Sequence, residues 1–399
     1  MKYIIFVPDG AADYPVKQLN GRTPLQAAHK PHIDKLACIS RCGLFKTIPD
    51  GFQTGSAVAN LSILGYDPLK YFQGRGVLEA ASMGVSLDTD DVALRCNTVC
   101  VEDGIMRSHS AGHITTKESG ELICALNTAL GSSRIKFYPG VSYRHLLVLK
   151  GGYSPDVECF PPHDHVGKPI SSIMVRARNA CGEKTAKLLN RIIEDSYGIL
   201  SSHPVNSRRV CEGKQPANTA WPWSPGRMPK MKPFTERFGI KAAVISAVDL
   251  VQGLGIYAGF DVIRVKGATG LWDTNYEGKA DACIEALREH DLVYVHVEAS
   301  DEAGHEGNPD LKIRCIEFFD QRLVGRVLSK IDLGNITIAL LPDHPTPVSV
   351  RGHTSEPVPF LIYKPSVSPD SVSCFDEQSC AAGSYGLLEN EDFIHEVFS

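Results

Sequence analysis

The clearest indication of architecture in this chain is the stretch Ile336-Thr-Ile-Ala-Leu-Leu-Pro-Asp-His344. Its apolar run from Ile336 to Leu341 is typical of a strand that is buried on both faces of a sheet, and an acid and a histidine follow it. The same order recurs at the start of the chain, where Tyr3–Val7 is followed by Asp9. Both runs therefore predict strands of a largely parallel sheet.

Strands and helices alternate along most of the chain. Further β-rich runs end at polar or glycine-rich turns, and helical patterns lie between them. The predicted strands are Ala242–Ser246, Asp261–Val265, Leu292–Val297 and Phe360–Tyr363, and the predicted helices are Thr23–Ile39, Glu277–His290 and Leu311–Ile331. This alternation predicts a doubly wound α/β core.

The middle of the chain departs from this pattern. From about residue 91 to residue 223 the alternation weakens, and histidine, arginine and proline accumulate. We therefore expect an inserted second α/β domain over residues 91–223, between two parts of a core at 1–90 and 224–399. The proline- and glycine-rich run Gln215–Arg227 predicts a hinge or a cross-over back into the core, although its two tryptophans should pack.

Composition narrows the range of functions. The 399 residues carry a net charge of −5 with both signs interspersed, so we expect a small-molecule substrate and no nucleic-acid partner. The apolar run before Asp9 is too short for a signal peptide or a membrane span, which favours a cytoplasmic protein without a membrane partner. The 12 cysteines are scattered without a C-x-x-C pair, which favours reduced, packed thiols.

Several strand ends carry side chains of the kind that bind metals. In open α/β sheets, ligands gather beyond the carboxyl ends of the strands. The residues expected at that edge are Asp9, Asp301, His305, Asp343, His344 and, in the following loop, His353. Mixed carboxylate and imidazole donors suit Mn²⁺ or Zn²⁺. Because they exceed one tetrahedral site, we expect two ions about 3.5–4 Å apart, as in enzymes that displace phosphoryl groups.

Ser56 is the candidate nucleophile. It stands in Thr54-Gly-Ser-Ala, before the helix-like run Ala57–Leu64. A helix N-terminus favours phosphate oxygens, and a hydroxyl bound to a dication ionises readily, so Ser56 is able to carry a covalent phosphate. The plain alternative is that this serine only caps the helix. Its presence together with the acidic strand ends favours the functional interpretation.

Two further features give weaker signals. His296, between Val295 and Val297 in a predicted strand, is interpreted as a packed histidine or one that supports a metal ligand. The loop Gly267-Ala-Thr-Gly270 is able to approach a phosphate, but short glycine loops are weak evidence.

Taken together, the motifs resemble one family. They are Val7-Pro-Asp-Gly10, Thr54–Pro68, Gly267–Gly270 with Asp273-Thr274, Asp301–His305, and Pro342-Asp-His344 with Gly352-His-Thr354. In this order, over nearly the whole chain, they resemble the archaeal-type cofactor-independent, or 2,3-bisphosphoglycerate-independent, phosphoglycerate mutases of the alkaline phosphatase superfamily. The resemblance implies an alkaline-phosphatase-like core and an isomerase of glycolysis that needs no 2,3-bisphosphoglycerate.

The resemblance also implies roles for the site residues. One metal ion would be held by Asp301, His305 and His353, and a second by Asp9, Ser56, Asp343 and His344. Mn²⁺ is expected, with Zn²⁺, Co²⁺ or Mg²⁺ as alternatives. Ser56 would take the phosphoryl group from 3-phosphoglycerate and return it to the 2-hydroxyl, while the inserted domain closes over the substrate and excludes water.

Residues that bind the substrate's anionic groups are expected in the insertion. The candidates are His113 in Ser110–Thr115, Arg144 beside Tyr143, and, less favoured, Arg208 and the cluster His163-Asp-His165. The family also uses an active-site lysine, and here Gln252 stands where we expect it. Lys241, Lys266 and Lys279 are candidates to replace it.

The missing lysine leaves other functions open. A homoserine kinase-like phosphotransferase would keep the same core and change the acceptor. A metal-dependent phosphatase or phosphodiesterase would fit if the insertion does not cover the site. A non-catalytic metal-binding protein with this fold is the alternative from a different class.

Overall fold

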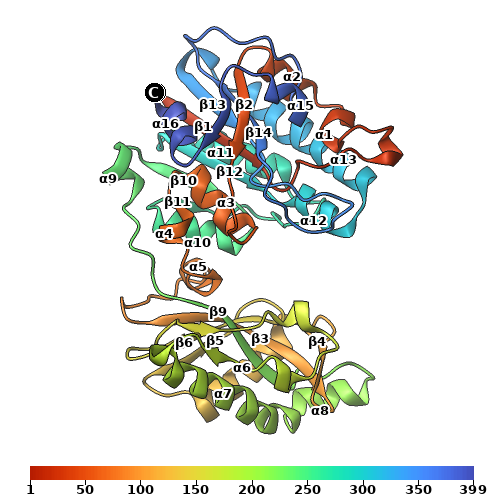
Figure 1. Cartoon of the computed structure of the whole chain (residues 1–399), viewed down its shortest axis with the longest axis vertical. Coiled ribbons are helices and arrows are strands. Elements are labelled where there is room, and N and C mark those ends of the chain that lie inside the picture. Colours follow the sequence, from red (N-terminus) through yellow and green to blue (C-terminus); the bar gives the residue numbers. More distant parts are fainter. The chain divides into compact units, whose positions relative to one another are not determined.

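The computed structural model describes all 399 residues. They form two compact units (Figure 1): the first combines Met1–Phe72 with Lys230–Ser399, and the second is the insertion Gln73–Pro229. The insertion is longer at both ends than the expected 91–223, because α5 (Arg75–Ser82) packs against its sheet and the last strand of that sheet continues to Gly226. At Gly76 an added Cβ would lie 2.5 Å from the carbonyl oxygen of Ala93, so this close approach requires glycine.

An eight-stranded sheet forms the centre of the first unit. In spatial order its strands are β11 (Asp261–Ile263), β10 (Ala242–Ile245), β12 (Leu292–Val297), β1 (Lys2–Pro8), β13 (Ile336–Leu340), β14 (Val358–Tyr363), β2 (Arg41–Lys46) and β15 (Gly386–Glu389). Only β14 runs against its neighbours, and all other pairs are parallel. The expected α/β class is confirmed, and every predicted strand is present. The sequence did not predict β2 or β15, which lack a continuous apolar run.

Helices cover both faces of this sheet, as the doubly wound arrangement requires (Figure 1). On one face, Ile4 and Phe6 of β1 share a core with Ile33 of α2 (Pro31–Ala37) and Tyr276 of α11 (Tyr276–Ala286). On the other face, the ring of Tyr3 lies 4.9 Å from that of Phe398 in α16 (Asp392–Phe398). The remaining helices of the unit are α1 (Pro24–Ala27), α3 (Ser56–Ile63), α4 (Pro68–Tyr71), α9 (Phe234–Phe238), α10 (Asp249–Tyr257), α12 (Ala299–Glu306), α13 (Pro309–Phe318), α14 (Gly325–Leu328) and α15 (Glu377–Ala381).

The predicted helix Thr23–Ile39 is wrong as a single element. Thr23 and Gln26 form a capping box that starts α1, and α2 begins separately at Pro31. A proline suits the first turn of a helix but keeps the residue before it, Lys30, out of helical geometry. The break therefore falls where the proline requires it.

The predicted helix Leu311–Ile331 is also divided. α13 leads through a π-helical turn, Phe319–Val324, into α14. In this turn the Asp320 carboxylate accepts the backbone N–H of Ile33, 2.7 Å away, which ties the turn to α2. The third predicted helix, Glu277–His290, corresponds to α11.

The second unit is built on an antiparallel sheet. Its order is β4-β3-β6-β5, and β9 also pairs with β3. The strands are β3 (Val92–Glu102), β4 (Ile105–Ser108), β5 (Ile135–Tyr138), β6 (Arg144–Leu149) and β9 (Thr219–Gly226), with a separate pair of β7 (Val157–Glu158) and β8 (Arg176–Ala177). Its longer helices are α6 (Thr116–Leu130), α7 (Glu183–Ser201) and α8 (Pro204–Cys211), and apolar residues of all three share one core with the sheet.

The expected hinge at Gln215–Arg227 is wrong, because most of this run is β9. Two prolines fit because β9 pairs only with β3, so the N–H groups on its outer edge are not needed. The expectation that the tryptophans pack is confirmed: Trp221 is 1% exposed and Trp223 is 5% exposed. The Trp221 indole N–H donates to the Phe160 carbonyl, and the Trp223 indole N–H donates to Asn97.

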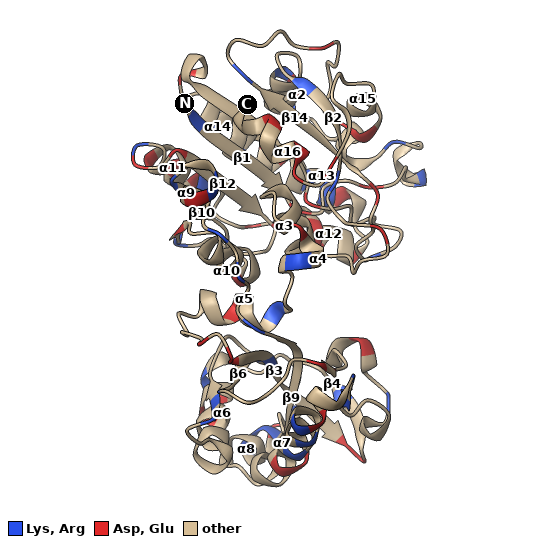
Figure 2. Ribbon diagram, turned by 60° about the vertical axis from the view of Figure 1, so that its left-hand side comes forward, with Lys and Arg blue, Asp and Glu red and all other residues tan.

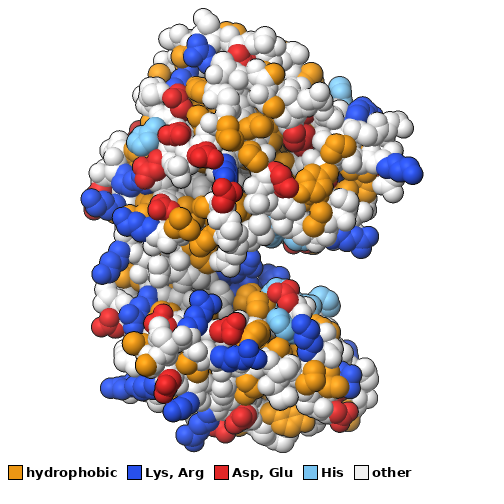
Figure 3. Space-filling view, viewed as in Figure 1, with side chains coloured by type: hydrophobic (Ala, Val, Ile, Leu, Met, Phe, Trp, Pro, Cys, Tyr) orange, Lys and Arg blue, Asp and Glu red, His pale blue; other side chains and the backbone are white.

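Charges of both signs are spread over the molecule. Figure 2 shows acidic and basic ribbon segments in both units, and blue and red side chains are interspersed on the face in Figure 3. The visible face therefore offers no broad basic surface of the kind that binds nucleic acid.

No helix has both the length and the apolar character needed to cross a membrane.

Candidate active site

Three acidic side chains meet at one edge of the eight-stranded sheet. β12, β1 and β13 are adjacent and parallel, so their carboxyl ends lie together. Asp9 follows β1, Asp343 follows β13, and Asp301 lies in the first turn of α12, after β12. Gly10 (φ +64°) permits this close approach, because an added Cβ would lie 2.7 Å from the Asp301 Cα. The three carboxylates are therefore brought together in a buried place.

Imidazoles surround Asp301. The Nε2 atom of His305 lies 3.3 Å from Asp301 Oδ2, and that of His353 lies 3.4 Å from Asp301 Oδ1. The two Nε2 atoms are only 2.9 Å apart. Burial by itself would raise the pKa of Asp301, but hydrogen bonds with His305 and His353 hold it well below its ordinary value. Asp301 is thus a carboxylate with two imidazole nitrogens directed at it.

Ser56 lies beside the same group of side chains. It is the first residue of α3, and its Oγ is 3.1 Å from His344 Nε2. His344 Nε2 is in turn 3.6 Å from an oxygen of Asp9 and 3.6 Å from an oxygen of Asp343. The N-cap position of α3 belongs to Gly55, and no side chain caps the helix. The hydroxyl of Ser56 is therefore not used as a cap, which was the plain alternative for this serine.

Two residues that the sequence analysis missed hold these side chains in place. Asn60 donates to the Ser56 carbonyl oxygen at 2.8 Å and to Asp343 Oδ2 at 2.9 Å, and it accepts a hydrogen bond from the Tyr294 hydroxyl. Thr346 donates its hydroxyl proton to Asp301 Oδ1. Asn60 had a detectable signal, because a residue four positions after Ser56 lies on the same face of the helix.

The donor set fits divalent cations. Asp9 Oδ1 is buried and has no hydrogen-bond partner. Burial raises the pKa of Asp9 well above its ordinary value, and the negative charges of Asp343 and Asp301 raise it further. A cation would neutralise this concentration of negative charge, and mixed oxygen and nitrogen donors suit Mn²⁺ or Zn²⁺. Ligand atoms of Asp301, His344 and His353 lie within 4.8 Å of one another, as do those of Asp9, His296 and Asp343.

The second unit contains a group of histidine and arginine side chains. Burial lowers the pKa of His109, and the charges of His113 and Arg144 lower it further, so these three lie close together. His163 belongs nearby, with its ring centroid 6.2 Å from that of His109. The sequence analysis missed His109, although it stands just before the Ser110–Thr115 segment.

The other candidates of the second unit, Arg208 and His165, interact with other residues. Arg208 is exposed on α8, where a hydrogen bond with Lys214 and then the charge of Arg208 lower the pKa of Glu212. His165 is held by a contact between its Nδ1 and the Pro161 carbonyl oxygen, 2.9 Å away. Neighbours of both reach the same region, because Arg209 donates to the Ala111 carbonyl at 2.7 Å and His165 shares a 3-10 helix with His163.

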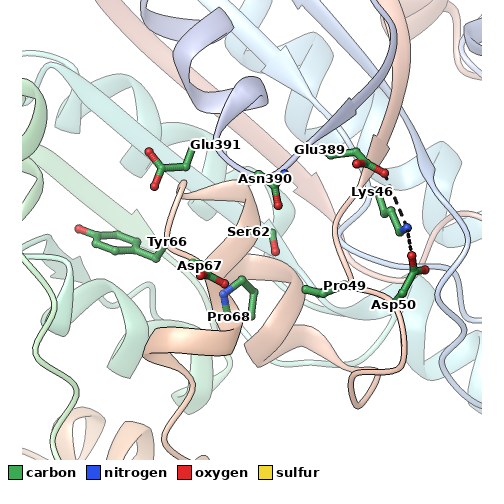
Figure 4. Close-up of a pocket in the computed structure, with 10 residues that line it drawn as sticks. All are labelled: Lys46, Pro49, Asp50, Ser62, Tyr66, Asp67, Pro68, Glu389, Asn390 and Glu391. Atoms are coloured by element: carbon green, nitrogen blue, oxygen red, sulfur yellow. Dashed lines mark hydrogen bonds and ion pairs between the residues drawn. The ribbon is translucent and has the colours of Figure 1, made fainter.

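A pocket on the first unit has none of the Asp and His residues described above in its lining (Figure 4). It is lined by Lys46, Pro49, Asp50, Ser62, Tyr66, Asp67, Pro68, Glu389, Asn390 and Glu391. The only lysine among them is already paired, because Lys46 Nζ lies 2.7 Å from Asp50 and 3.6 Å from Glu389. The pocket therefore shows neither a nucleophile near an acid–base group nor an unpaired anchor for a ligand.

Known proteins resemble this chain over its whole length. The family model of 2,3-bisphosphoglycerate-independent phosphoglycerate mutase matches residues 37–206. The enzyme of that name from Methanosarcina barkeri is 51% identical over 397 residues, which cover 99% of this chain and 98% of the relative. The chain belongs to this family of mutases.

Solved structures agree with this assignment. The cofactor-independent phosphoglycerate mutase of Thermoplasma acidophilum is 30% identical, with a TM-score of 0.70 over 100% of this chain and 99% of that one. A protein of Pyrococcus horikoshii is 32% identical, with a TM-score of 0.86 over 99% and 96% of the two chains. The resemblance seen in the motifs is confirmed. This member of the mutase family is an enzyme, and its chemistry is phosphoryl transfer on the α/β core.

The lysine expected in the mutase family has one buried candidate. Lys279 of α11 is 1% exposed, and its Nζ donates to the His296 carbonyl oxygen at 3.0 Å, at the edge that carries the acids. Lys241 and Lys266 are exposed. The Gly267–Gly270 loop also ends at this edge, because an added Cβ at Gly270 would lie 2.0 Å from a carboxylate oxygen of Glu298. Glu298, which the sequence analysis missed, has a ligand atom within 4.8 Å of Asp9 and Asp301.

Burial of Lys279 should make the stability of the first unit depend on pH. Burial lowers its pKa to about 8, and the charge of Glu298 opposes this shift only in part. The unfolded chain has a lysine pKa of about 10.4, so it binds more protons than the folded protein between pH 8 and 10.4, and stability rises with pH in that window. The free energy of unfolding should increase by about 3 kcal/mol across this pH window.

Replacing Lys279 by methionine isolates the contribution of this lysine to the pH dependence of stability. The difference in free energy of unfolding between the wild type and Lys279→Met should move by about 3 kcal/mol in favour of the wild type between pH 7 and 10.5. Denaturant unfolding at both pH values measures it, and Lys266→Met, at an exposed site, should show no such change. A constant difference for Lys279→Met would mean that this ammonium keeps an ordinary pKa.

Proposed function

We propose that the chain interconverts 3-phosphoglycerate and 2-phosphoglycerate through a phosphoserine at Ser56, and that this activity depends on two divalent metal ions. The observation that carries the proposal is the position of the Ser56 hydroxyl. It lies at the start of α3, 3.1 Å from His344 Nε2, within the group of buried carboxylates and imidazoles. Ser300 also lies in the first turn of a helix beside the acids, but its hydroxyl donates to the Asp9 carbonyl at 2.6 Å.

The metal-binding residues divide into two sets. Asp301, His305 and His353 would hold one ion, and Asp9, Ser56, Asp343 and His344 the other, with Mn²⁺ as the expected metal and no need for 2,3-bisphosphoglycerate. When bound, the two ions would lower the pKa of the Ser56 hydroxyl and neutralise charge on the transferred phosphoryl group. Asn60 fixes the geometry, because it binds both the Ser56 backbone and Asp343.

The residues of this chain then perform two displacements. In the first, the Ser56 hydroxyl loses its proton and Oγ bonds to phosphorus, while the bond from phosphorus to the 3-oxygen of the substrate breaks and that oxygen takes up a proton. In the second, the 2-oxygen of glycerate loses its proton and bonds to phosphorus, while the bond from phosphorus to Ser56 Oγ breaks and Oγ takes up a proton. The backbone N–H groups at the start of α3 favour the phosphoryl oxygens in both steps.

His113 and Arg144 would bind the anionic groups of the substrate. Arg144 is exposed at the start of β6, and its guanidinium lies over the Tyr143 ring, 5.3 Å from the centroid. Stacking limits the orientations of the planar guanidinium, so less entropy is lost when it pairs with a carboxylate or phosphate. His113 adds a second donor in the same group of side chains.

Product analysis tests the function directly. Purified protein with Mn²⁺ should convert 3-phosphoglycerate into 2-phosphoglycerate, measured by ³¹P NMR, without added 2,3-bisphosphoglycerate. Parallel incubations with homoserine plus ATP, and with p-nitrophenyl phosphate, test the kinase-like and phosphatase alternatives. Absence of 2-phosphoglycerate in the metal-loaded protein would refute the proposal, and phosphohomoserine or sustained phosphate release would indicate the alternative.

Metal binding should strengthen as the pH rises. A hydrogen bond with Asp301 raises the pKa of His305 to about 9, so without metal this imidazole is protonated at neutral pH. A metal ligand must be deprotonated, so Mn²⁺ affinity should rise about tenfold per pH unit between pH 6 and 8. Calorimetry in buffers of different ionisation enthalpy should show release of about one proton. A Mn²⁺ affinity that does not change with pH would contradict the binding of the metal by a histidine that is protonated in its absence.

Arg144→Ala should raise KM about 10- to 100-fold with little change in the fold, because one charge-assisted pair contributes about 1.5–3 kcal/mol. Arg208→Ala is the matched control. Arg208 is an exposed arginine of the same unit whose charge acts on Glu212, so we expect less than about a twofold change in KM. Steady-state kinetics of both variants measures this. A larger change in KM for Arg208→Ala than for Arg144→Ala would mean that Arg208, and not Arg144, binds the substrate.

A further inference from the structure

His296 is a buried histidine that the ligand sets proposed above do not use. It lies in β12, is 0% exposed, and pairs in register with Val7 of β1, two residues before Asp9. The side chain therefore projects from the centre of the sheet near its carboxyl edge. Its ring reaches the acids directly, because its Nε2 is 3.1 Å from Asp9 Oδ2.

The Nε2 atom of His296 lacks a hydrogen bond. Although Asp9 Oδ2 is close, the geometry does not satisfy a hydrogen bond, and Nε2 is buried without a partner. Asp9 Oδ1 is also buried without a partner. A buried polar atom normally has a hydrogen-bond partner. Two such atoms in one cluster are therefore available to bind a ligand that the protein itself does not supply. Nε2 and one oxygen each of Asp9 and Asp343 lie within 4.8 Å of one another.

The other ring nitrogen shows which tautomer fits. His296 Nδ1 lies 3.3 Å from Ser246 Oγ, which already accepts the backbone N–H of Val248 at 3.0 Å. If Nδ1 carries the proton, it donates to Ser246 and leaves a lone pair on Nε2 that faces the carboxylates. In the opposite tautomer, an Nε2–H would donate to Asp9, but its direction does not suit a hydrogen bond. The first tautomer is the one that metal-bound histidines adopt.

Hydrogen bonds also fix the residue that orients the imidazole. Ser246 is itself held in position, because Gln252 donates to its carbonyl oxygen at 2.8 Å. The glutamine at the place where a lysine was expected thus supports the residue that orients His296.

We propose that His296 binds a divalent cation through Nε2, together with Asp9 and Asp343. Ser246 is a positioning residue that sets the tautomer and the ring orientation. This inference rests on the metal dependence proposed above and adds a ligand that the family resemblance does not supply. An imidazole in this place also shifts the preference of the site from Mg²⁺ towards metals that accept nitrogen, such as Mn²⁺, Zn²⁺ or Co²⁺.

The test measures metal binding and not only activity. His296→Gln should weaken the binding of one of two Mn²⁺ ions by at least about 100-fold in calorimetry, and Ser246→Ala by about tenfold. His290→Gln is the matched control. His290 is another buried histidine of the same unit, bonded to Asp261 and the Ala286 carbonyl, so its loss should leave Mn²⁺ affinity unchanged.

A direct observation on the wild type covers the case in which His296→Gln fails to fold. In ¹¹³Cd-loaded protein with ¹⁵N-labelled histidine, the His296 Nε2 should show scalar coupling to cadmium, in addition to His305, His344 and His353. Unchanged Mn²⁺ affinity in a folded His296→Gln variant, or a wild-type spectrum without that coupling, would overturn the inference while metal dependence stands. A wild-type protein that binds no divalent cation would overturn both.

Discussion

Ser56→Ala should abolish the phosphoenzyme and lower kcat by on the order of 10⁴-fold or more, because no other group takes over the covalent step. The fold should survive, since the serine side chain caps no helix and only loses its contact with His344. Brief incubation with ³²P-labelled 3-phosphoglycerate, followed by acid quench, detects the phosphoprotein. Intact-mass analysis should show one added phosphoryl group on the wild type and none on the variant.

Ser62→Ala provides the matched control. Ser62 lies on the same helix and donates only a long hydrogen bond of 3.4 Å to the Val58 carbonyl, so its loss should leave labelling and kcat near the wild-type values. Labelling of Ser56→Ala at the wild-type level would place the nucleophile elsewhere. An unlabelled but fully active variant would instead indicate direct transfer without an intermediate on the protein.

Lys312→Met should destabilise the first unit by about 3–5 kcal/mol, the usual cost of removing one partner of a buried ion pair. Lys312 and Asp13 are fully buried, with Nζ 2.7 Å from Asp13 Oδ2. Lys312 also donates to the carbonyl oxygens of Ala12 and Thr346, so it joins the loop after Asp9 to the loop after His344. Methionine fills a similar volume but leaves the buried Asp13 charge without its cation, and only backbone N–H groups such as that of Val348 still donate to it.

The measurement must resolve the first unit, because a chain of two units need not unfold in one step. Native-state hydrogen exchange of the β1 and β13 amides reports its stability. Adding Asp13→Asn to Lys312→Met should recover a large part of the loss, because the uncompensated charge is removed. Lys330→Met, at an exposed lysine, should change the stability by less than about 0.5 kcal/mol. A small effect at Lys312 would show that water reaches Asp13.

Much of the site was predictable because it follows strands. Asp9, Asp343 and His344 come directly after apolar runs, and parallel neighbouring strands bring their carboxyl ends to one edge whatever the details of packing. Asp301 and His305 are one turn apart on α12, so a single helix face carries both. These relations depend only on local periodicity and on a general rule of sheet topology.

Other residues gave no local signal. Lys312 sits in a pattern typical of a surface helix, and only the packing of α13 against the loops at Ala12 and Thr346 makes it a buried partner of Asp13. Lys279 was one of three equivalent lysines until burial distinguished it. Gln215–Arg227 contains the residues of a hinge, but pairing with β3 turns it into a strand.

The order of apolar runs, turns and acids in the sequence was enough to predict the α/β class, the strands of the core and the place where its acidic side chains meet. Packing settled what no local pattern encodes: where proline and a π-helical turn divide the helices, which lysine is buried, and which nitrogen of His296 faces Asp9. The physical reason is that periodicity records which side of an element is buried. The partner of a buried polar group depends on contacts between segments hundreds of residues apart, such as Asp13 and Lys312.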